Sequence, residues 1–364
     1  NPASICFASP MIDPPSRAST IAFSAGVQTR SMSSTGGFIF PGIPRESGFD
    51  ITAASEIMAI MCLTENLEDL KGRLGNIFIG YTFDKKPIYA RDLNAEGAMA
   101  TLLKDALKPN LVQTVEGNPA IIHLGPFANI AQGTNSVIAT RMGMSLSDYT
   151  VTEAGFGFDL GAEKFLDIKC QSAGLAPKVI VMTTTIRALK YHGGAALATL
   201  TIPNVEALEK GLPNLEKHLE NAKLYNITPV IAINKFYIDS DEEIQVIFDL
   251  ARRLDIKVAL SDGWAKGGEG ALELAEKVIE AIEENQSEFT PLYKWDEDVM
   301  TKIGTIAKKI YGADKVEYSP KARKDLKTIL DLELENLPIC IAKTQKSLSD
   351  DPFLLGRPTG FTLN

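Results

Sequence analysis

The stretch Val151–Cys170, VTEAGFGFDLGAEKFLDIKC, gathers residue types that could do chemistry. Glu153 and Asp159 carry carboxylates that could bind a hydroxyl group, a ribose or a metal ion. Gly155 and Gly157 lack side chains, so the backbone beside them could approach a ligand closely. The many small and polar residues predict a loop, and we expect it to be ordered by a ligand or by another segment of backbone.

Two segments of similar composition precede it, PRESGFDIT (Pro44–Thr52) and PAIIHLGPFANIAQGTNS (Pro119–Ser136). The second contains His123, which follows a short apolar run and is expected in the core. For His192, in KYHGG, a structural and a catalytic role both remain open, and the structural role is favoured. His218 lies in a polar helical pattern and is expected at the surface.

The glycine-rich segment Lys266–Leu274, KGGEGALEL, is typical of a phosphate loop that opens a helix, although its glycines could serve only to turn the chain. The sequence has no G-x-x-x-x-G-K-[ST], HExxH or GxSxG pattern and no GxGxxG at a strand–helix turn. A hydrolase with an activated nucleophile and a Rossmann-type dehydrogenase therefore have no support in the sequence.

Composition narrows the class of protein. The 364 residues are enough for two or three domains, and the net charge of -9 disfavours a dedicated nucleic-acid binder. The four cysteines (Cys6, Cys62, Cys170 and Cys340) lack CxxC spacing, which predicts buried thiols in a reducing compartment, without a metal site or a disulfide framework. No apolar run approaches the length of a membrane span, so no membrane partner is predicted.

The N-terminal residues 1–41 differ from the rest. Pro14–Gly37 is rich in Ser, Thr, Ala and Gly, and it contains Arg17 and Arg30 but no acidic residue. This composition predicts a tail, or the end of an organellar transit peptide. We expect a cytoplasmic protein, or a mitochondrial or plastid one if the segment is a transit peptide.

The second half alternates apolar runs with helical patterns, which predicts an α/β fold of parallel strands joined by helical crossovers. The expected strands are Lys178–Thr184, Thr228–Asn234 and Lys257–Ser261, and the expected helices are Val205–Leu224, Asp239–Leu254 and Gly270–Asn285. Elsewhere we expect helices at Phe49–Leu63, Leu67–Leu74, Gly97–Asp105 and Pro291–Ile310, a strand at Ile77–Tyr81, and buried strands at Ala120–Leu124 and Leu337–Thr344. The predicted domains are residues 42–170, 171–285 and 286–364.

In a parallel sheet, ligands collect at the carboxyl ends of the strands. Phe236 follows the end of one predicted strand and Trp264 follows the end of the next. The two aromatic rings could hold a flat heterocycle between them, or each could cover the core; both interpretations remain open from the residues alone.

Eight ordered blocks between Gly42 and Phe361 resemble formate–tetrahydrofolate ligase. They are PRESGFDITAASEIMAI, GPFANIAQGTNSVIA, VTEAGFGFDLGAEKF, TTTIRALKYHGG, INKFYIDSDEE, WAKGGEG, LPICIAKTQKSLSDDP and LLGRPTGF. The resemblance implies ligation of formate to tetrahydrofolate at the expense of ATP, through formyl phosphate, with Mg²⁺ assisting at the phosphates. It also implies a fold akin to P-loop NTPases, in truncated form, and a homo-oligomer, either a dimer or a tetramer.

The resemblance assigns roles to particular residues. It implies that Phe236 and Trp264 hold the pterin ring of the folate, with Leu260 lining the same pocket. It further implies that the loop from Glu153 to Gly157, especially Ala154 and Gly155, lies against the adenine nucleotide.

The resemblance also has a gap. The family's GEGKTT-type phosphate loop and the cationic residues that handle formyl phosphate have no counterpart in this sequence. Catalytic residues are therefore not assigned, and binding of the ATP triphosphate is expected to be impaired. The alternative function is a catalytically inactive folate- or nucleotide-binding fragment, or a partner subunit.

Overall fold

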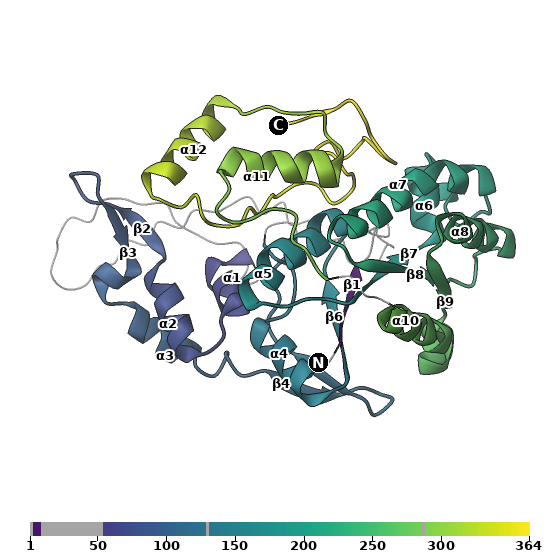
Figure 1. Cartoon of the computed structure of the whole chain (residues 1–364), viewed down its shortest axis with the longest axis horizontal. Helices are drawn as coiled ribbons and strands as arrows, with labels where there is room; N and C mark the ends of the chain where they lie inside the picture. The colour runs from purple at the N-terminus through teal and green to yellow at the C-terminus, as the bar shows by residue number, and fades with distance from the viewer. Residues whose placement is uncertain (1–2, 9–53, 129–130, 285–287) are drawn as a thin grey trace.

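The computed structural model of the chain describes residues 3–8, 54–128, 131–284 and 288–364, and its centre is a five-stranded sheet (Figure 1). The strands lie in the order β6 (Tyr149–Ala154), β1 (Ala3–Ala8), β7 (Val179–Thr184), β8 (Thr228–Asn234) and β9 (Lys257–Ser261). All four neighbouring pairs are parallel. The prediction of an α/β fold with a parallel sheet is thus confirmed.

β1 comes from the N-terminal segment that we expected to be a tail. Its backbone pairs on one side with β6, where Ala3 lies opposite Tyr149, and on the other with β7, where Ile5 lies opposite Val179. A strand of this segment therefore lies between β6 and β7. The block Pro44–Thr52 and the transit-like sequence lie outside the described residues.

The expected crossover helices are present. They are α7 (Val205–Leu224), α8 (Asp241–Leu254) and α10 (Leu272–Glu284). A further helix that was not predicted, α6 (Ile186–His192), and the 3₁₀ turn η5 (Leu197–Thr199) precede α7. Ser240 caps α8 through a capping box in which its hydroxyl accepts from the backbone N–H of Glu243. The bounds of β8, β9 and α7 are those predicted.

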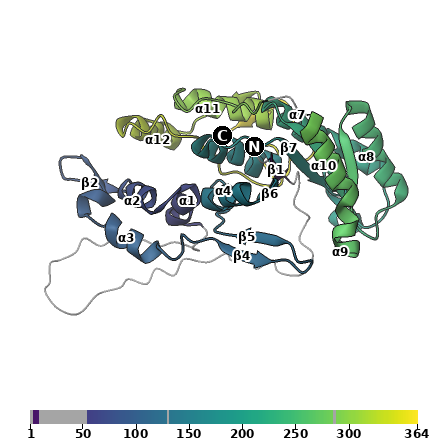
Figure 2. The same cartoon turned by 60° about the horizontal axis from the view of Figure 1, so that its bottom comes forward.

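Alternating side chains of β7 and β8 divide the apolar core between the two faces of the sheet. Ile180, Met182, Ile231 and Ile233 belong to the larger core, together with residues of α7 and α8. Val179, Val181, Val230 and Ala232 form a smaller core with α10. Helices cover both faces (Figure 2), which explains why these strands are apolar throughout.

The chain between β1 and β6 forms a separate small core. Its helices are α1 (Glu56–Leu63), α2 (Leu67–Gly75), η2 (Ala90–Leu93), α3 (Glu96–Leu103) and α4 (Val137–Leu146), and its hairpins are β2–β3 (Phe78–Tyr81, Pro87–Tyr89) and β4–β5 (Asn110–Gln113, Pro119–Ile122). A strand forms where one was predicted at Ala120–Leu124, but the prediction that it is buried was wrong. Ile122 is 60% exposed, in a two-stranded hairpin. Two antiparallel strands without a covering layer leave their apolar side chains in solvent.

The stretch from Phe158 onward is not a loop, contrary to expectation. Residues 158–173, called here the buried helix, combine η3 (Phe158–Ala162), η4 (Phe165–Cys170) and α5 (Gln171–Ala173), and much of their length is π-helical. Most of the segment is buried, including its charged side chains. Packing contacts therefore order a sequence that looks irregular by composition.

The C-terminal part contains α11 (Val299–Thr305), η7 (Ile306–Tyr311), α12 (Pro320–Asp331) and the short parallel pair β10 (Lys315–Val316) and β11 (Thr362–Leu363). The predicted buried strand at Leu337–Thr344 was wrong: the segment has no regular structure, and Leu337 is 53% exposed. Within the described ranges, no helix is both long and apolar enough to cross a bilayer.

His218 lies on α7 and its side chain is buried, so the surface position predicted for it was wrong. Cys62 and Cys170 are buried free thiols, as expected, but Cys340 is exposed. Burial raises the pKa of Cys62 to about 12, which keeps this thiol protonated and unreactive at neutral pH.

A buried ion pair joins the helices that follow β7 and β8. Lys190 Nζ lies 2.8 Å from Glu243 Oε1, and both side chains are buried. We expect Lys190→Met to lower the free energy of unfolding by about 3–5 kcal/mol, because it leaves Glu243 as an uncompensated buried charge. Lys210→Met, in the exposed Lys210–Glu206 pair, is the control and should cost less than about 1 kcal/mol. If urea unfolding shows the same loss of stability for Lys190→Met and Lys210→Met, the Lys190–Glu243 pair does not have the stabilising role given to it here.

Candidate functional site

The candidate site lies along the carboxyl ends of the parallel strands. β6 ends at Ala154, β8 at Asn234 and β9 at Ser261, so the segments that follow them emerge at one rim of the sheet. β6 and β9 stand four strand positions apart, which corresponds to about 19 Å at the usual spacing of about 4.8 Å. The two sets of predicted site residues thus share a rim but occupy its opposite ends.

The residues predicted to bind folate lie on two adjacent strand ends. Leu260 is half-buried, pairs with Ile233 and packs against the larger core. Trp264, on α9 (Gly263–Lys266), is 86% exposed, so it does not cover the core. Phe236 is half-buried, and the backbone N–H of Lys235 beside it donates to the carbonyl of Ser261 at 3.0 Å. The structure therefore brings the two loops together.

Arg187 is a member of this group that the sequence reasoning missed. Its guanidinium lies over the Phe236 ring, 4.0 Å from the ring centroid, in a cation–π contact. Asp239 holds the same loop, because its Oδ2 accepts the backbone N–H of Phe236 at 2.8 Å. Arg187 follows the carboxyl end of β7, so the strand-end rule that selected Phe236 could also have selected Arg187.

The residues predicted to contact the nucleotide form a tight turn after β6. The backbone N–H of Gly155 donates to the carbonyl of Gly133 at 3.1 Å. A Cβ on Gly133 would lie 2.2 Å from Ala128 Cβ, and a Cβ on Gly161 would lie 1.5 Å from the Gly155 carbonyl oxygen. These glycines bring three stretches of backbone together, which explains their presence without any ligand.

The remaining predicted nucleotide-side residues differ in exposure. Ala154 is buried, whereas Glu153, also on β6, has an exposed side chain that could face a ligand from solvent. Gly157 is buried, and its carbonyl accepts the first backbone hydrogen bonds of the buried helix, from Leu160 and Gly161. Of this set, Glu153 alone offers a solvent-exposed charged side chain.

Behind this turn, the buried helix carries three carboxylates. Asp159 pairs with Lys343, whose Nζ lies 2.5 Å from Asp159 Oδ2. Burial by itself would raise the pKa of Asp159, but the charge and hydrogen bond of Lys343 bring it below its ordinary value. Asp167 accepts hydrogen bonds from Tyr225 Oη at 2.6 Å and from the N–H of Leu292 at 2.8 Å. Even so, burial raises the pKa of Asp167 to about 7.

Glu163, between these two acids, has neither carboxyl oxygen hydrogen-bonded. Burial raises its pKa well above the ordinary range; Lys164 opposes the rise, and Asp167 and Asp159 add to it. Lys164 itself donates to the carbonyl of Ala128 at 2.9 Å. The Glu163 carboxyl is thus more readily protonated than an ordinary glutamate.

His123 and His192 have structural partners, whereas Nδ1 of the buried His218 has no hydrogen-bond partner among the described residues. His123 is buried, with Nδ1 2.6 Å from Ser136 Oγ and Nε2 2.9 Å from the carbonyl of Ala106. His192 Nδ1 accepts the backbone N–H of Gly356 at 2.9 Å. Burial lowers the pKa of His192 and of His218 to about 4, so both are neutral at pH 7. The structural role favoured for His192 agrees with these contacts.

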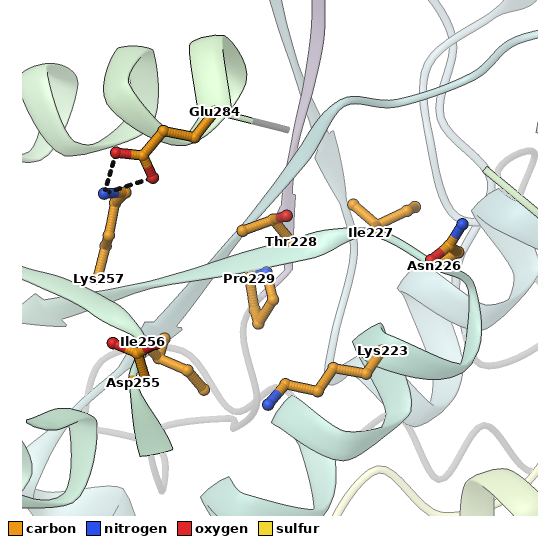
Figure 3. A pocket seen from close by; sticks show the side chains of 9 residues that line it. All are labelled: Lys223, Asn226, Ile227, Thr228, Pro229, Asp255, Ile256, Lys257 and Glu284. Carbon is orange, nitrogen blue, oxygen red and sulfur yellow. Dashed lines mark hydrogen bonds and ion pairs between the residues drawn. The ribbon is translucent and has the colours of Figure 1, made fainter. Parts of the chain in front are cut away.

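A pocket elsewhere in the sheet does not belong to this site. It has a volume of about 420 Å³ and is lined by Lys223, Thr228, Lys257 and Glu284 among others (Figure 3). Lys257 Nζ lies 2.9 Å from Glu284 Oε2. Thr228 and Lys257 begin β8 and β9, so the pocket opens at the amino ends of the strands, away from the rim that carries Phe236 and Trp264.

Fold and site together define a parallel α/β protein whose candidate ligand-binding residues lie along the carboxyl rim of one sheet. The family model for formate–tetrahydrofolate ligase matches residues 28–364, and the chain therefore belongs to the formate–tetrahydrofolate ligase family. This match confirms the resemblance and begins ahead of Gly42, the first residue of the blocks that carry it. The family uses ATP and tetrahydrofolate as substrates, and at family level the chain is a ligase of one-carbon metabolism.

Gly161 tests the tight packing of the turn after β6. Because a Cβ would overlap the Gly155 carbonyl, we expect Gly161→Ala to lower the free energy of unfolding by about 1–3 kcal/mol and to displace this turn. Gly304→Ala is a matched control, because Gly304 lies in α11 with open space around it and alanine favours a helix by up to about 1 kcal/mol. The free energy of unfolding of both variants is measured with a chemical denaturant. If Gly161→Ala leaves it unchanged, the packing argument is wrong.

The pH dependence of stability tests the protonated state of Glu163. An acid whose pKa is raised by folding stabilises the protein fully below its unfolded pKa, and this contribution falls as pH rises above about 4.5. Glu163→Gln should therefore reduce the loss of stability above pH 4.5, by at most about 1.4 kcal/mol per pH unit. Asp167, whose pKa burial raises to about 7, loses stability in the same direction, whereas His192 and His218 lose it as pH falls from 6.5 toward 4; all three are present in both proteins. Parallel pH profiles of unfolding for the two proteins would show that Glu163 is ionised.

Proposed function

We propose that this chain ligates formate to tetrahydrofolate at the expense of ATP and so forms 10-formyltetrahydrofolate. Family membership supports the class of reaction. The observation that carries the assignment of the site is that Phe236, Leu260 and Trp264 share a sheet rim with the Gly155 turn. A reaction between a nucleotide and a folate requires both to bind on the same side of the protein.

In this proposal the pterin ring lies between Phe236 and Trp264, with Leu260 as an apolar wall. Trp264 offers an exposed aromatic ring, and Arg187 lies over the Phe236 ring. The guanidinium would also orient the Phe236 ring before the folate binds. Stacking of this kind is tolerant of ring substitution but demands a flat ligand.

The nucleotide would lie at the other end of the rim, against Glu153, Ala154, Gly155 and Gly157. A formate oxygen attacks the γ-phosphorus of ATP, the bond to the β-phosphate oxygen breaks, and ADP leaves. The amine of tetrahydrofolate then attacks the carbonyl carbon of formyl phosphate, and inorganic phosphate leaves as the amine loses a proton. Both steps depend mainly on positioning and on neutralising phosphate charge.

Mg²⁺ is expected to accompany the ATP phosphates. Within the described residues, no group of three or more His, Cys, Asp or Glu side chains could hold a metal ion. The ion is expected to be held in part by phosphate oxygens and water, as is common for Mg²⁺.

We also propose that the architecture is akin to that of P-loop NTPases and that the chain forms a homo-oligomer. The parallel sheet with covered faces supports the first proposal. Exposed apolar side chains support the second, among them Phe83 on the turn between β2 and β3, Leu102 on α3 and Leu111 on β4.

Trp264→Ala tests the folate site. We expect tetrahydrofolate affinity, measured by calorimetry, to fall at least about tenfold, since stacking on one aromatic ring contributes roughly 1–3 kcal/mol. Tyr237→Ala is the control. Tyr237 is next to Phe236 in the chain and is about as exposed as Trp264, at 88% and 86%, but it has no proposed role. If Trp264→Ala binds as the unchanged protein does, the pterin site is wrongly placed.

The activity itself is measured as ADP release that depends on both formate and tetrahydrofolate. Turnover supports the ligase. Tetrahydrofolate binding without turnover would favour the alternative, a binding fragment or partner subunit.

A further inference from the structure

The tip of the β4–β5 hairpin contacts the loop that carries Trp264. Glu116, in the turn between the two strands, accepts the backbone N–H of Gly268 through Oε1 at 2.6 Å. Gly268 lies in η6 (Gly267–Ala271), which follows α9 directly. Figure 2 shows the hairpin extending toward α9. The contact joins parts of the chain that are 152 residues apart in sequence.

The glycines of this loop fit the Glu116 carboxylate closely. A Cβ on Gly267 would lie 2.4 Å from Glu116 Oε1, and a Cβ on Gly268 would lie 2.6 Å from Oε2. Gly267 also has a φ of 59°, which glycine adopts without strain. Two of the three glycines of KGGEG, Gly267 and Gly268, thus lie against a carboxylate of the same chain.

The loop is closed on itself around Trp264. The N–H of Asp262 donates to the carbonyl of Gly270 at 2.9 Å, and the N–H of Lys266 donates to the carbonyl of Asp262 at 3.0 Å. Because the Trp264 side chain is 86% exposed, core packing does not fix its position. The place of the indole depends on how the whole loop is held, and Glu116 holds it from outside.

The other end of the hairpin is fixed near the Gly155 turn. β5 runs into His123, whose two ring nitrogens are engaged by Ser136 and Ala106. The chain continues to Ala128, which accepts a hydrogen bond from Lys164. The turn itself is internally bonded, since the N–H of Asn118 donates to Thr114 Oγ1 at 3.0 Å. The hairpin is therefore an ordered connection between the two ends of the rim.

We propose that Glu116 is a positioning residue for tetrahydrofolate binding: it fixes the loop of Trp264 to the hairpin, so that the indole lies where the pterin needs it. The inference rests on the folate site proposed above. Glu116 does not touch the pterin and acts through Gly268.

The contact itself is tested without any ligand. Hydrogen exchange of the peptide covering residues 263–271 should become at least about tenfold faster in Glu116→Ala, because Gly268 loses its acceptor and the loop opens more readily. Glu116→Gln should retain part of the protection, since the amide oxygen can still accept. Glu283→Gln, at an exposed carboxylate near the far end of α10, should leave exchange unchanged. Unchanged exchange in Glu116→Ala would overturn the proposal.

The role in binding is tested by tetrahydrofolate calorimetry on the same variants. We expect Glu116→Ala to weaken binding about tenfold, equivalent to roughly 1.4 kcal/mol, with Glu116→Gln intermediate and kcat unchanged at saturating folate. Thermal unfolding midpoints equal to that of the unchanged protein would show that the loss is local.

The two proposals fail in different ways. If Trp264→Ala loses tetrahydrofolate but Glu116→Ala does not, the positioning role is wrong and the folate site stands. Tighter binding in Glu116→Ala would also refute positioning, because the carboxylate would then compete with the ligand. If Trp264→Ala binds normally, the folate site itself is wrong, whatever the exchange data show.

Discussion

The burial of five ionisable side chains on one helix is the constraint on which the rest of this structure depends. Asp159, Glu163, Lys164, Asp167 and Lys169 all lie out of contact with solvent in the buried helix. Four of them have partners from remote segments, which are Lys343 near the C-terminus, the loop around Ala128 and Asn135, and Tyr225 after α7. Glu163 has no hydrogen-bond partner among the described residues. The packing of this helix therefore depends on all these segments.

The same constraint explains where sequence reasoning succeeded and failed. β8 and β9 were predicted to the residue, because a strand covered on both faces is apolar throughout and ends abruptly. The buried helix was missed, because its charges read as solvent-exposed unless the distant partners are known. His218 was misplaced for the same reason, since α7 looks polar on a face that the C-terminal segment covers.

Within the site, the strand-end rule placed Phe236 and Trp264 on adjacent loops from sequence alone, and the strands before these loops, β8 and β9, are neighbours in the sheet. What each glycine does could not be predicted. Gly155 and Gly161 meet backbone, whereas Gly267 and Gly268 meet a carboxylate, and both patterns look like ligand loops by composition. Glu116 could not have been found, because no local signal links it to a loop 152 residues away.

The division of the core between two faces of the sheet has a consequence for motion. α10 packs against a smaller core than α7 and α8 do, and within the described residues β9 pairs only with β8. Such a unit opens at a lower free-energy cost than the rest of a domain. Since Trp264 lies between β9 and α10, local opening of this unit would move the Trp264 end of the rim relative to the turn after β6, which the buried helix backs.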